Sequence, residues 1–559
     1  MYGSSGRYSN ALQLEEPLVE LSKVVVGEEH PDTLTRIQNL AISYSRVGRY
    51  SDALQLAEPL VELSKVVLGE EHPDTLTRIQ NLAISYSGVG RYNDALQLAE
   101  PLVELSKKVL GEEHPDSLHR IQNLAVRYSE VGRYNDALQL EEPLVELSVK
   151  VLGEEHPDTL TRIQNLGIGY SDVGRYNDAL QLAESLVELS EKVLGEEHPD
   201  SLSRTQNLAI SYSKAGRYND GFQLAKPLVE LSKKVLGGEH PDTLTRIQNL
   251  AISYSELGRY NEALQLAEPL VELSKKILGE EHPDSLHRVQ NLAVRYSEVG
   301  RYNDALQLAE PLVELSKKVL GEEHPETLTR IQNLAMSYSE AGRYNDAFQL
   351  EEPLVELSKK VLGERHPDTL TRIQNLAISY FEVERYDDAL QLEEPLMELS
   401  KKLLGEEHPE NLSRIQNLSI SYSKVGRHND ALQLAELLVG LSKKVFGEEH
   451  PDTLTRIESL AVRYSKVGRY NDTLQLAEHL VELSKKVLGE EHPDTLTRIQ
   501  NLAITYSKVG RYNDALQLEE PLVELSKKVL GKNTHTLYTE YKAWQSAILR
   551  LEDTMMHCN

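Results

Sequence analysis

The sequence predicts an all-α solenoid built from pairs of helices. The first observation is a Gly-Arg pair that recurs every 42 residues without insertion, from Gly6 to Gly510, with Glu384-Arg385 in the one gap. The second is an apolar spacing of helical period that occurs twice in each repeat, and the third is the confinement of proline to two repeat positions. A fixed period of this length indicates stacked supersecondary units, because a single repeat cannot bury its own apolar face.

The first residues begin in the middle of a repeat. Tyr2 stands 42 residues before Tyr44, so residues 1–5 are interpreted as the truncated remnant of a helix whose front half is missing. The end of a solenoid normally carries a polar capping element. Two interpretations follow: the favoured one is that the chain is a fragment, and the other is an N-terminal end-to-end contact with a further chain.

The array itself occupies residues 6–531, with twelve full repeats and a thirteenth copy of the helix that opens each repeat. In residues 532–559 the repeat pattern dissolves. Apolar residues at helical spacing there, including the only tryptophan, Trp544, predict one amphipathic capping helix and a tail. We expect Trp544 to pack on the last repeat.

One helix of each repeat, here called helix A, is predicted between Pro73 and Gly90. Proline suits the first helical position, and the acid that follows suits the positive helix N-terminus. Gly90 is expected to end the helix in the left-handed conformation. The apolar residues of this helix lie on one face: Leu76, Ile79, Leu82, Ala83, Tyr86 and Val89.

The other helix, here called helix B, is predicted from Tyr50 to Leu68, with a broad apolar stripe that suits two neighbours. It contains a proline in ten repeats, as at Pro59. An internal proline costs about 3 kcal/mol in a straight helix. We therefore predict that helix B kinks or restarts near Glu58. The repeats without this proline are expected to be straighter; they carry Ser185, Leu437 and His479.

One repeat departs from the glycine turn, because Glu384 stands where the others have glycine. A non-glycine residue in the left-handed conformation costs roughly 1 kcal/mol. We therefore expect local strain or fraying at this turn.

Composition narrows the classes of partner. The chain carries a formal net charge of -28, and its Lys and Arg alternate with acids, which does not favour nucleic acid. The only cysteine is Cys558, so no disulfide framework forms within the chain. No apolar run reaches the roughly 18 residues of a membrane helix. We expect a cytoplasmic protein that binds neither nucleic acid nor membrane.

No residue set points to catalysis or to a cofactor. The GEEHPD turn places carboxylates beside a histidine, as at His72, but such turns repeat outward with no second ligand set that converges on them. Catalysis needs one asymmetric pocket with perturbed groups. We therefore expect no metal, no cofactor and no enzymatic activity.

Three motifs carry a family resemblance. L-x-x-L-A-x-x-Y in helix A, G-R-Y after it and A-L-Q-L-A in helix B resemble the tetratricopeptide repeat. The 42-residue length and the ending K-V-L-G-E-E-H-P-D resemble its kinesin-light-chain type. The resemblance implies a right-handed superhelix in which helix A lines a concave groove that binds extended peptides. The N-terminal heptad coiled coil of a kinesin light chain and the P-loop of a nucleotide-switch receptor are not found, so only the array carries over.

The resemblance also implies which positions of helix A face the groove: Thr77, Gln80, Asn81, Ile84 and Ser87. Asparagine is a mediocre helix former, so its recurrence needs another reason, and its amide offers donors and an acceptor to a peptide backbone. The alternative is a structural ladder to the neighbouring helix. The recurring residues are Asn39, Asn81, Asn123, Asn165, Asn207, Asn249, Asn291, Asn333, Asn375, Asn417 and Asn501.

Two sets of arginine are also considered. Arg78 has an equivalent in all twelve helices A, and its favoured interpretation is an ion pair with Asp74 or Glu70 of its own turn. A second set recurs every four repeats: Arg127, Arg295 and Arg463. Block duplication is the favoured explanation of this second set, and a stripe that contacts a peptide ligand is the alternative.

The sequence thus predicts a non-catalytic scaffold that binds an extended protein or peptide segment in the groove. The first alternative is a kinesin-light-chain-like cargo adaptor. The second is a detached repeat tract of a nucleotide-switch receptor with no independent function. The near-identical repeats do not identify the ligand.

Overall fold

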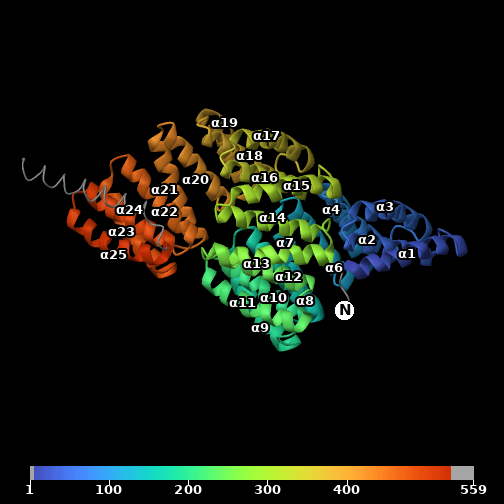
Figure 1. The fold of residues 1–559 in the computed structure, drawn as a ribbon. Coiled ribbons are helices and arrows are strands. Elements are labelled where there is room, and N and C mark those ends of the chain that lie inside the picture. Colours follow the sequence, from blue (N-terminus) through green and yellow to red (C-terminus); the bar gives the residue numbers. More distant parts are fainter. Residues whose placement is uncertain (1–4, 531–559) are drawn as a thin grey trace, which may run out of the picture. The chain divides into compact units, whose positions relative to one another are not determined.

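The computed structural model describes residues 5–530, and within them the chain forms 25 helices and no strand (Figure 1). Helices A are α2 (Pro31–Arg46), α4 (Pro73–Gly88), α6 (Pro115–Glu130), α8 (Pro157–Asp172), α10 (Pro199–Lys214), α12 (Pro241–Glu256), α14 (Pro283–Glu298), α16 (Pro325–Glu340), α18 (Pro367–Glu382), α20 (Pro409–Lys424), α22 (Pro451–Lys466) and α24 (Pro493–Lys508). Helices B are α1 (Ser5–Val25), α3 (Tyr50–Val67), α5 (Tyr92–Leu110), α7 (Tyr134–Leu152), α9 (Tyr176–Leu194), α11 (Tyr218–Leu236), α13 (Tyr260–Leu278), α15 (Tyr302–Leu320), α17 (Tyr344–Val361), α19 (Tyr386–Leu404), α21 (His428–Val445), α23 (Tyr470–Val487) and α25 (Tyr512–Leu530).

The predicted all-α solenoid of paired helices is confirmed, and the thirteenth helix B is present as α25. The expected cap in residues 532–559, with Trp544, lies outside the described residues, as do residues 1–4 of the predicted remnant. Ser5 already belongs to α1.

Contacts divide the chain after Gly405 into a first part, α1 to α19, and a second part, α20 to α25, and each is described by itself. Within each part, every helix packs against the helices next to it in the chain. None of the described helices is long and apolar enough to cross a lipid bilayer.

The core consists of small apolar clusters between neighbouring helices. One cluster joins α5, α6 and α7 through Leu96, Ala99, Val103, Leu118, Ile121, Leu124 and Leu144. Ala53 of α3 and Leu76 of α4 are both fully buried. Because each cluster draws on two or three helices, a repeat depends on its neighbours to keep its apolar face from water.

The turn histidine caps the start of helix A. His72 lies in the extended conformation, and its Nδ1 accepts a hydrogen bond from the Asp74 backbone N–H at 3.2 Å. Pro73 follows at the first helical position, as predicted. The imidazole is thus the N-cap acceptor, in place of the usual Ser or Asp side chain. It accepts from an N–H group that has no partner inside the helix.

The end of helix A is closed by the predicted left-handed glycine. Gly90 has a φ of 78°, and the Arg91 N–H donates to the Tyr86 carbonyl at 2.9 Å. This is the Schellman arrangement of hydrogen bonds. The Arg91 guanidinium then lies 4.5 Å from the centre of the Tyr86 ring and pairs with Asp94 at 2.6 Å, so the Gly-Arg pair fixes the entry into the next helix B.

Helix B does not restart at its proline, so the predicted restart near Glu58 is wrong, while the predicted kink and the straighter helices without proline stay predictions. Helix α3 runs from Tyr50 to Val67 with Pro59 inside it. Helix α9, which has Ser185 at this position, is as long as α5, which has proline. Pro59 is exposed, so water can reach the Gln55 carbonyl that loses its N–H partner, and this offsets part of the cost.

A column of buried polar side chains runs between helices A and B. Arg78 of α4 is only 2% exposed, and its Nη1 donates to the Ser64 Oγ of α3 at 3.2 Å. Ser64 and Thr75 beside it are fully buried. Burial lowers the pKa of the Arg78 guanidinium, because the charged form loses its water.

The same arginines join successive repeats. Arg288 of α14 donates from Nη1 to the Ser274 Oγ of α13 at 3.1 Å. From Nη2 it donates to the Thr245 Oγ1 of α12 at 3.3 Å. The planar fork therefore fixes one helix A against both the preceding helix B and the preceding helix A.

The predicted ion pair of this arginine with an acid of its own turn needs correction. Such a pair forms between Arg330 and Glu326 and between Arg414 and Glu410, at 2.8 and 2.9 Å. Arg78 bonds the serine hydroxyl of helix B instead. The hydroxyl lies inside the helix interface with the guanidinium, whereas Asp74 is exposed at the helix start.

Glu384 keeps the left-handed turn, with a φ of 63°, as the only described non-glycine residue with positive φ. The Arg385 N–H still donates to the Tyr380 carbonyl at 2.9 Å. The turn is therefore strained, as predicted, and does not fray.

We expect Glu384→Gly to stabilise this turn by about 1 kcal/mol, because glycine adopts the left-handed conformation without the steric penalty. Hydrogen exchange of the α18 and α19 amides measures the local opening free energy. The reciprocal change Gly342→Glu, where an added Cβ meets nothing within 4 Å, is the control and should destabilise by a similar amount. Unchanged exchange in both variants would contradict the strain.

We expect Arg288→Lys to destabilise the array by about 1–3 kcal/mol, because an ammonium cannot span the two hydroxyls that the guanidinium bonds. The midpoint of urea unfolding should fall. Arg301→Lys is the matched control: Arg301 is 48% exposed, and its loss should change stability by less than about 1 kcal/mol. Equal midpoints for both variants would show that the buried column is dispensable.

Candidate functional site

Successive helices A form one continuous wall in each part. Within the first part, the Arg120 guanidinium of α6 donates to the Thr77 hydroxyl of α4 at 3.4 Å, and the Ser87 hydroxyl of α4 donates to Glu130 of α6 at 2.7 Å. Direct contacts recur between successive helices A, from α2 with α4 to α14 with α16. The candidate peptide-binding positions lie on this wall.

The wall carries polar amides beside exposed aliphatic side chains. Gln80 and Asn81 are half-buried on α4, one turn before Ile84, which is 41% exposed. The other exposed aliphatic residues at the Ile84 position are Ile168, Ile210, Val294, Met336, Ile378 and Val462. An apolar stripe flanked by amides suits an extended polypeptide, which presents alternating side chains and backbone groups.

Most amides of the asparagine row bond nothing within the described chain. Asn123 and Asn291 donate to the carbonyls of His119 and His287 in their own helices, at 3.0 and 3.1 Å. Asn501 donates to Glu458 of the preceding helix A at 2.7 Å. The half-buried members with no hydrogen bond among the described residues are Asn81, Asn165, Asn207, Asn249, Asn333, Asn375 and Asn417.

The four-repeat arginines lie buried at the end of helix A. Arg127 is 7% exposed, pairs with Glu130 at 3.2 Å and donates to Ser87 of the preceding helix A. Arg295 repeats this arrangement with Glu298, at 3.1 Å. Burial lowers the pKa of both guanidiniums, because their water is lost. Their contacts therefore connect helix A to helix A.

In the second part, the third member of this set has a different neighbour. Arg463 donates to the Ser423 hydroxyl at 3.2 Å, and the residue three positions later is Lys466 instead of a glutamate. Lys466 donates to the same hydroxyl at 3.0 Å. Burial, followed by the positive charges of Arg463 and Lys424, lowers the pKa of Lys466.

Five helices B carry a glutamate where the other repeats have alanine. Glu15 is half-buried, and the other four are buried: Glu141, Glu351, Glu393 and Glu519. Burial, with Asp172 nearby, raises the pKa of Glu141 to about 8. Burial raises the pKa of Glu351 to about 7, and the hydrogen bond that the Ser379 hydroxyl donates to its charged form opposes this rise. Gly169 stands opposite Glu141 where Ser379 stands opposite Glu351, so Glu141 lacks that hydroxyl.

A cavity of about 210 Å³ opens beside this glycine, between α8 and α10 and over α9. Its walls are mainly apolar, from Ile163, Ile168, Ala183, Leu186 and Ile210. Amides and a lysine stand among its polar lining: Gln164, Asn207 and Lys214. The cavity therefore lies on the wall that carries the asparagine row.

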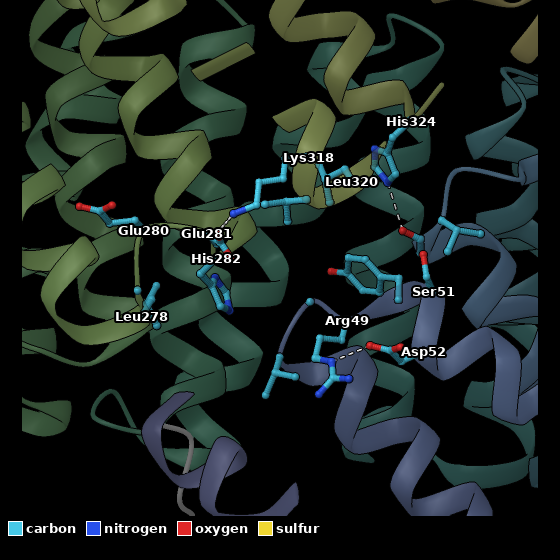
Figure 2. Close-up of a pocket in the computed structure, with 17 residues that line it drawn as sticks. Arg49, Ser51, Asp52, Leu278, Glu280, Glu281, His282, Lys318, Leu320 and His324 are labelled. Atoms are coloured by element: carbon cyan, nitrogen blue, oxygen red, sulfur yellow. Dashed lines mark hydrogen bonds and ion pairs between the residues drawn. The ribbon is translucent and has the colours of Figure 1, made fainter. Parts of the chain in front are cut away.

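A second cavity, of about 590 Å³, lies where the first part returns to itself (Figure 2). The His324 ring reaches across 236 residues of sequence to the Gly88 carbonyl at 3.1 Å. The labelled Arg49 and Asp52 pair at 2.5 Å, and Lys318 and Glu281 at 2.7 Å. Because these charged side chains are already paired, the cavity offers a ligand few free charges.

No group of three or more His, Cys, Asp and Glu side chains that could hold a metal lies among residues 5–530. Sequence reasoning did not find the buried Ser64, the capping role of His72 or the cavity beside Gly167. One signal was available: Gly167 replaces an alanine or serine that stands at this position in the other eleven helices A.

Two family models, both described as tetratricopeptide repeat, match the chain. One matches residues 1–32, 33–74, 75–116, 117–158 and 159–200. The other matches residues 201–276, 246–310, 285–353, 372–444 and 458–528. None of the curated proteins compared with the chain matches it.

Solved structures also resemble the chain. One is a Podosopora anserina protein described by the words "kinesin light chain nearly identical TPR-like repeats", with 32% identity, a TM-score of 0.32, and coverage of 37% of this chain and 98% of that chain. A point variant of that protein gives 32% identity, a TM-score of 0.33 and coverage of 37% and 97%. BtubC (BKLC) from P. vanneervenii gives 17% identity, a TM-score of 0.35 and coverage of 41% and 92%.

Glu141 should make stability depend on pH. Its folded pKa of about 8 lies above the ordinary 4.5, so between these values the folded chain keeps a proton that the unfolded chain releases. The stabilisation is complete below pH 4.5 and is lost as the pH rises to about 8, with a slope of up to about 1.4 kcal/mol per pH unit.

We expect Glu141→Ala, which restores the residue found in most repeats, to flatten this slope and to stabilise the chain at pH 8. Urea unfolding at several pH values measures the effect. Glu142→Ala is the control, because Glu142 is an exposed neighbour that should leave the slope unchanged. The slope that Glu351 contributes below pH 7 should remain, but a slope in Glu141→Ala equal to that of the native chain would rule out Glu141 as a source.

Proposed function

The chain belongs to the tetratricopeptide repeat family, and we propose that it is a protein-interaction scaffold whose helix-A wall binds an extended peptide segment. Proteins of this family are typically non-catalytic scaffolds. We propose the same for this chain, with a protein or peptide as its ligand and no cofactor.

The observation that carries the proposal is the row of unbonded amides. Asn207 and Asn249 stand at the same position of successive helices A, and their amides make no hydrogen bond among the described residues. Neither amide is among the buried unpartnered polar atoms of the described residues, so both stay open to an extended backbone, which can supply an acceptor and a donor. The alternative, a structural ladder, requires each asparagine amide to bond the neighbouring helix. Among the described residues of the row, Asn501 makes such a bond and the others do not.

The aliphatic stripe supports the same proposal. Ile210 lies one turn after Asn207 and is 38% exposed, and Ile168 on α8 is 46% exposed. Exposed aliphatic residues repeated on one wall favour contact with a partner's apolar side chains. A peptide held by amides along its backbone would place alternate side chains against this stripe.

Cargo adaptor work is a second candidate, because a solved relative carries kinesin light chain in its name. A kinesin heavy chain that co-purifies with the full chain would favour it. A repeat tract without any ligand is the remaining alternative.

The test uses the full chain and an array of immobilised short peptides of random sequence. We expect the triple variant Asn207→Ala, Asn249→Ala, Asn291→Ala to bind the peptides selected by the native chain at least about thirtyfold more weakly, because Asn207 and Asn249 are the two whose amides are unbonded in the described chain. Each lost hydrogen bond is worth about 1 kcal/mol, and about 1.4 kcal/mol corresponds to a tenfold change in Kd.

The matched control replaces three asparagines at the same spacing on exposed starts of helices B: Asn219, Asn261 and Asn303. This variant should bind like the native chain, and circular dichroism should show equal helicity for all three proteins. Unchanged binding by the helix-A variant would sink the proposal.

A further inference from the structure

Nothing in the described structure around Gly167 requires glycine at this position. It lies inside helix α8 without a positive φ, so its backbone does not require glycine. A Cβ placed there would lie 3.9 Å from the Leu182 side chain and 4.0 Å from the Ala179 carbonyl, which is ordinary contact. Alanine would therefore fit, and it is the better helix former.

The second glycine of the same helix is different. A Cβ on Gly169 would lie 2.1 Å from Oε2 and 3.3 Å from Cδ of Glu141, which is itself only 7% exposed. Gly169 is therefore explained by the buried glutamate of α7 that it faces. No such close neighbour explains Gly167. The effect of the missing side chain at Gly167 is to leave space beside α8.

That space belongs to the cavity of about 210 Å³ between α8 and α10. Gly167 lines it together with Ile168, Ile210 and Leu186, so its surface is mainly apolar. An apolar cavity of about 150 Å³ is enough to hold a benzene molecule in a protein. The volume beside Gly167 therefore admits an aromatic ring or a large aliphatic side chain.

The position of the cavity favours a side chain over a free small molecule. Gln164 and Asn207 line it, and neither amide is bonded within the described chain. An extended backbone along the asparagine row would find amide partners on both sides of the cavity, with one side chain directed into it.

We propose that the cavity beside Gly167 is a binding pocket for one large apolar side chain, of phenylalanine or leucine size, from the extended segment that the wall binds. This inference rests on the proposed function, since it adds the position and the chemistry of one anchor residue. Gly167 determines the pocket through the absence of its side chain, and the other helices A carry alanine or serine there.

The experiment uses the full chain and three probes: N-acetyl-phenylalaninamide, N-acetyl-leucinamide and N-acetyl-serinamide. Saturation-transfer NMR reports which probe contacts the protein. We expect transfer to the phenylalanine and leucine probes and none to the serine probe. Gly167→Ala should weaken binding of the two apolar probes at least about fourfold, the effect of one methyl group of apolar contact. The midpoint of its thermal unfolding should rise, which shows that the fold is intact.

Gly440→Ala is the matched control. Gly440 lies in helix α21, is exposed, and an added Cβ there meets nothing within 4 Å. It should raise the unfolding midpoint in the same way and leave probe binding unchanged. Apolar probes that do not bind the native chain, or that bind Gly167→Ala equally well, would overturn the pocket.

Failure of the pocket and failure of the proposed function give different results. If probe binding does not depend on Gly167 but the asparagine variant no longer binds the peptides, the proposed pocket is wrong and the proposed scaffold function is supported. If probe binding depends on Gly167 but the asparagine variant still binds the peptides, the proposed role of the asparagine row is wrong and the proposed pocket is supported.

Discussion

The buried arginine column is the constraint on which the array depends. From Arg78 onward, each guanidinium of this column is buried between helices, where a charge without partners is unfavourable. Serine of helix B and threonine or serine of the preceding helix A supply its acceptors, as Ser274 and Thr245 do for Arg288. Those acceptors are in reach only if three helices keep one relative position. The column therefore sets the register of the stack, while the apolar clusters hold it together.

The column is not fully satisfied, since the Nε atoms of Arg78, Arg204 and Arg288 are buried without a partner in the described chain. An apolar residue of similar size would avoid the cost of burying an unpartnered N–H group. It would also allow neighbouring helices to pack at more than one relative position. We interpret the column as a specificity device. In a chain of near-identical repeats this matters more than elsewhere, because a helix could otherwise pair with the wrong copy.

The turn histidine combines a local and a distant role. Nδ1 of His324 accepts the Glu326 N–H, so the proton of the neutral ring lies on Nε2 and is donated to the Gly88 carbonyl. His366 makes the same contact with the Glu130 carbonyl at 3.0 Å. Glycine permits the approach, because a Cβ on Gly90 would lie 2.1 Å from Pro325 Cδ. A residue that caps a helix in every repeat thus also fastens the first part to itself.

The 42-residue period, the two helices of each repeat and their ends were predictable from the sequence, because they depend on interactions between residues close together in the chain. The Gly90 turn and the Pro73 start depend on neighbours a few residues away, so a single repeat contains the information. Local rules of this kind wrongly predicted a restart at Pro59, because the cost of an internal proline depends on whether the freed carbonyl faces water. They also assigned Arg78 to the acid of its own turn, because the serine that it bonds, 14 residues away, is placed there by helix packing.

The sequence by itself determined the repeat, the helix pairs and the row of asparagines. Only the tertiary structure decided which of those amides lack a partner, where the buried glutamates meet a hydroxyl, and that Gly167 opens a cavity. The physical reason is that identical repeats carry identical local information. What distinguishes one repeat from the next is the neighbour that stacking brings to it, 28 residues away for Glu141 and Gly169 and 236 residues away for His324 and Gly88.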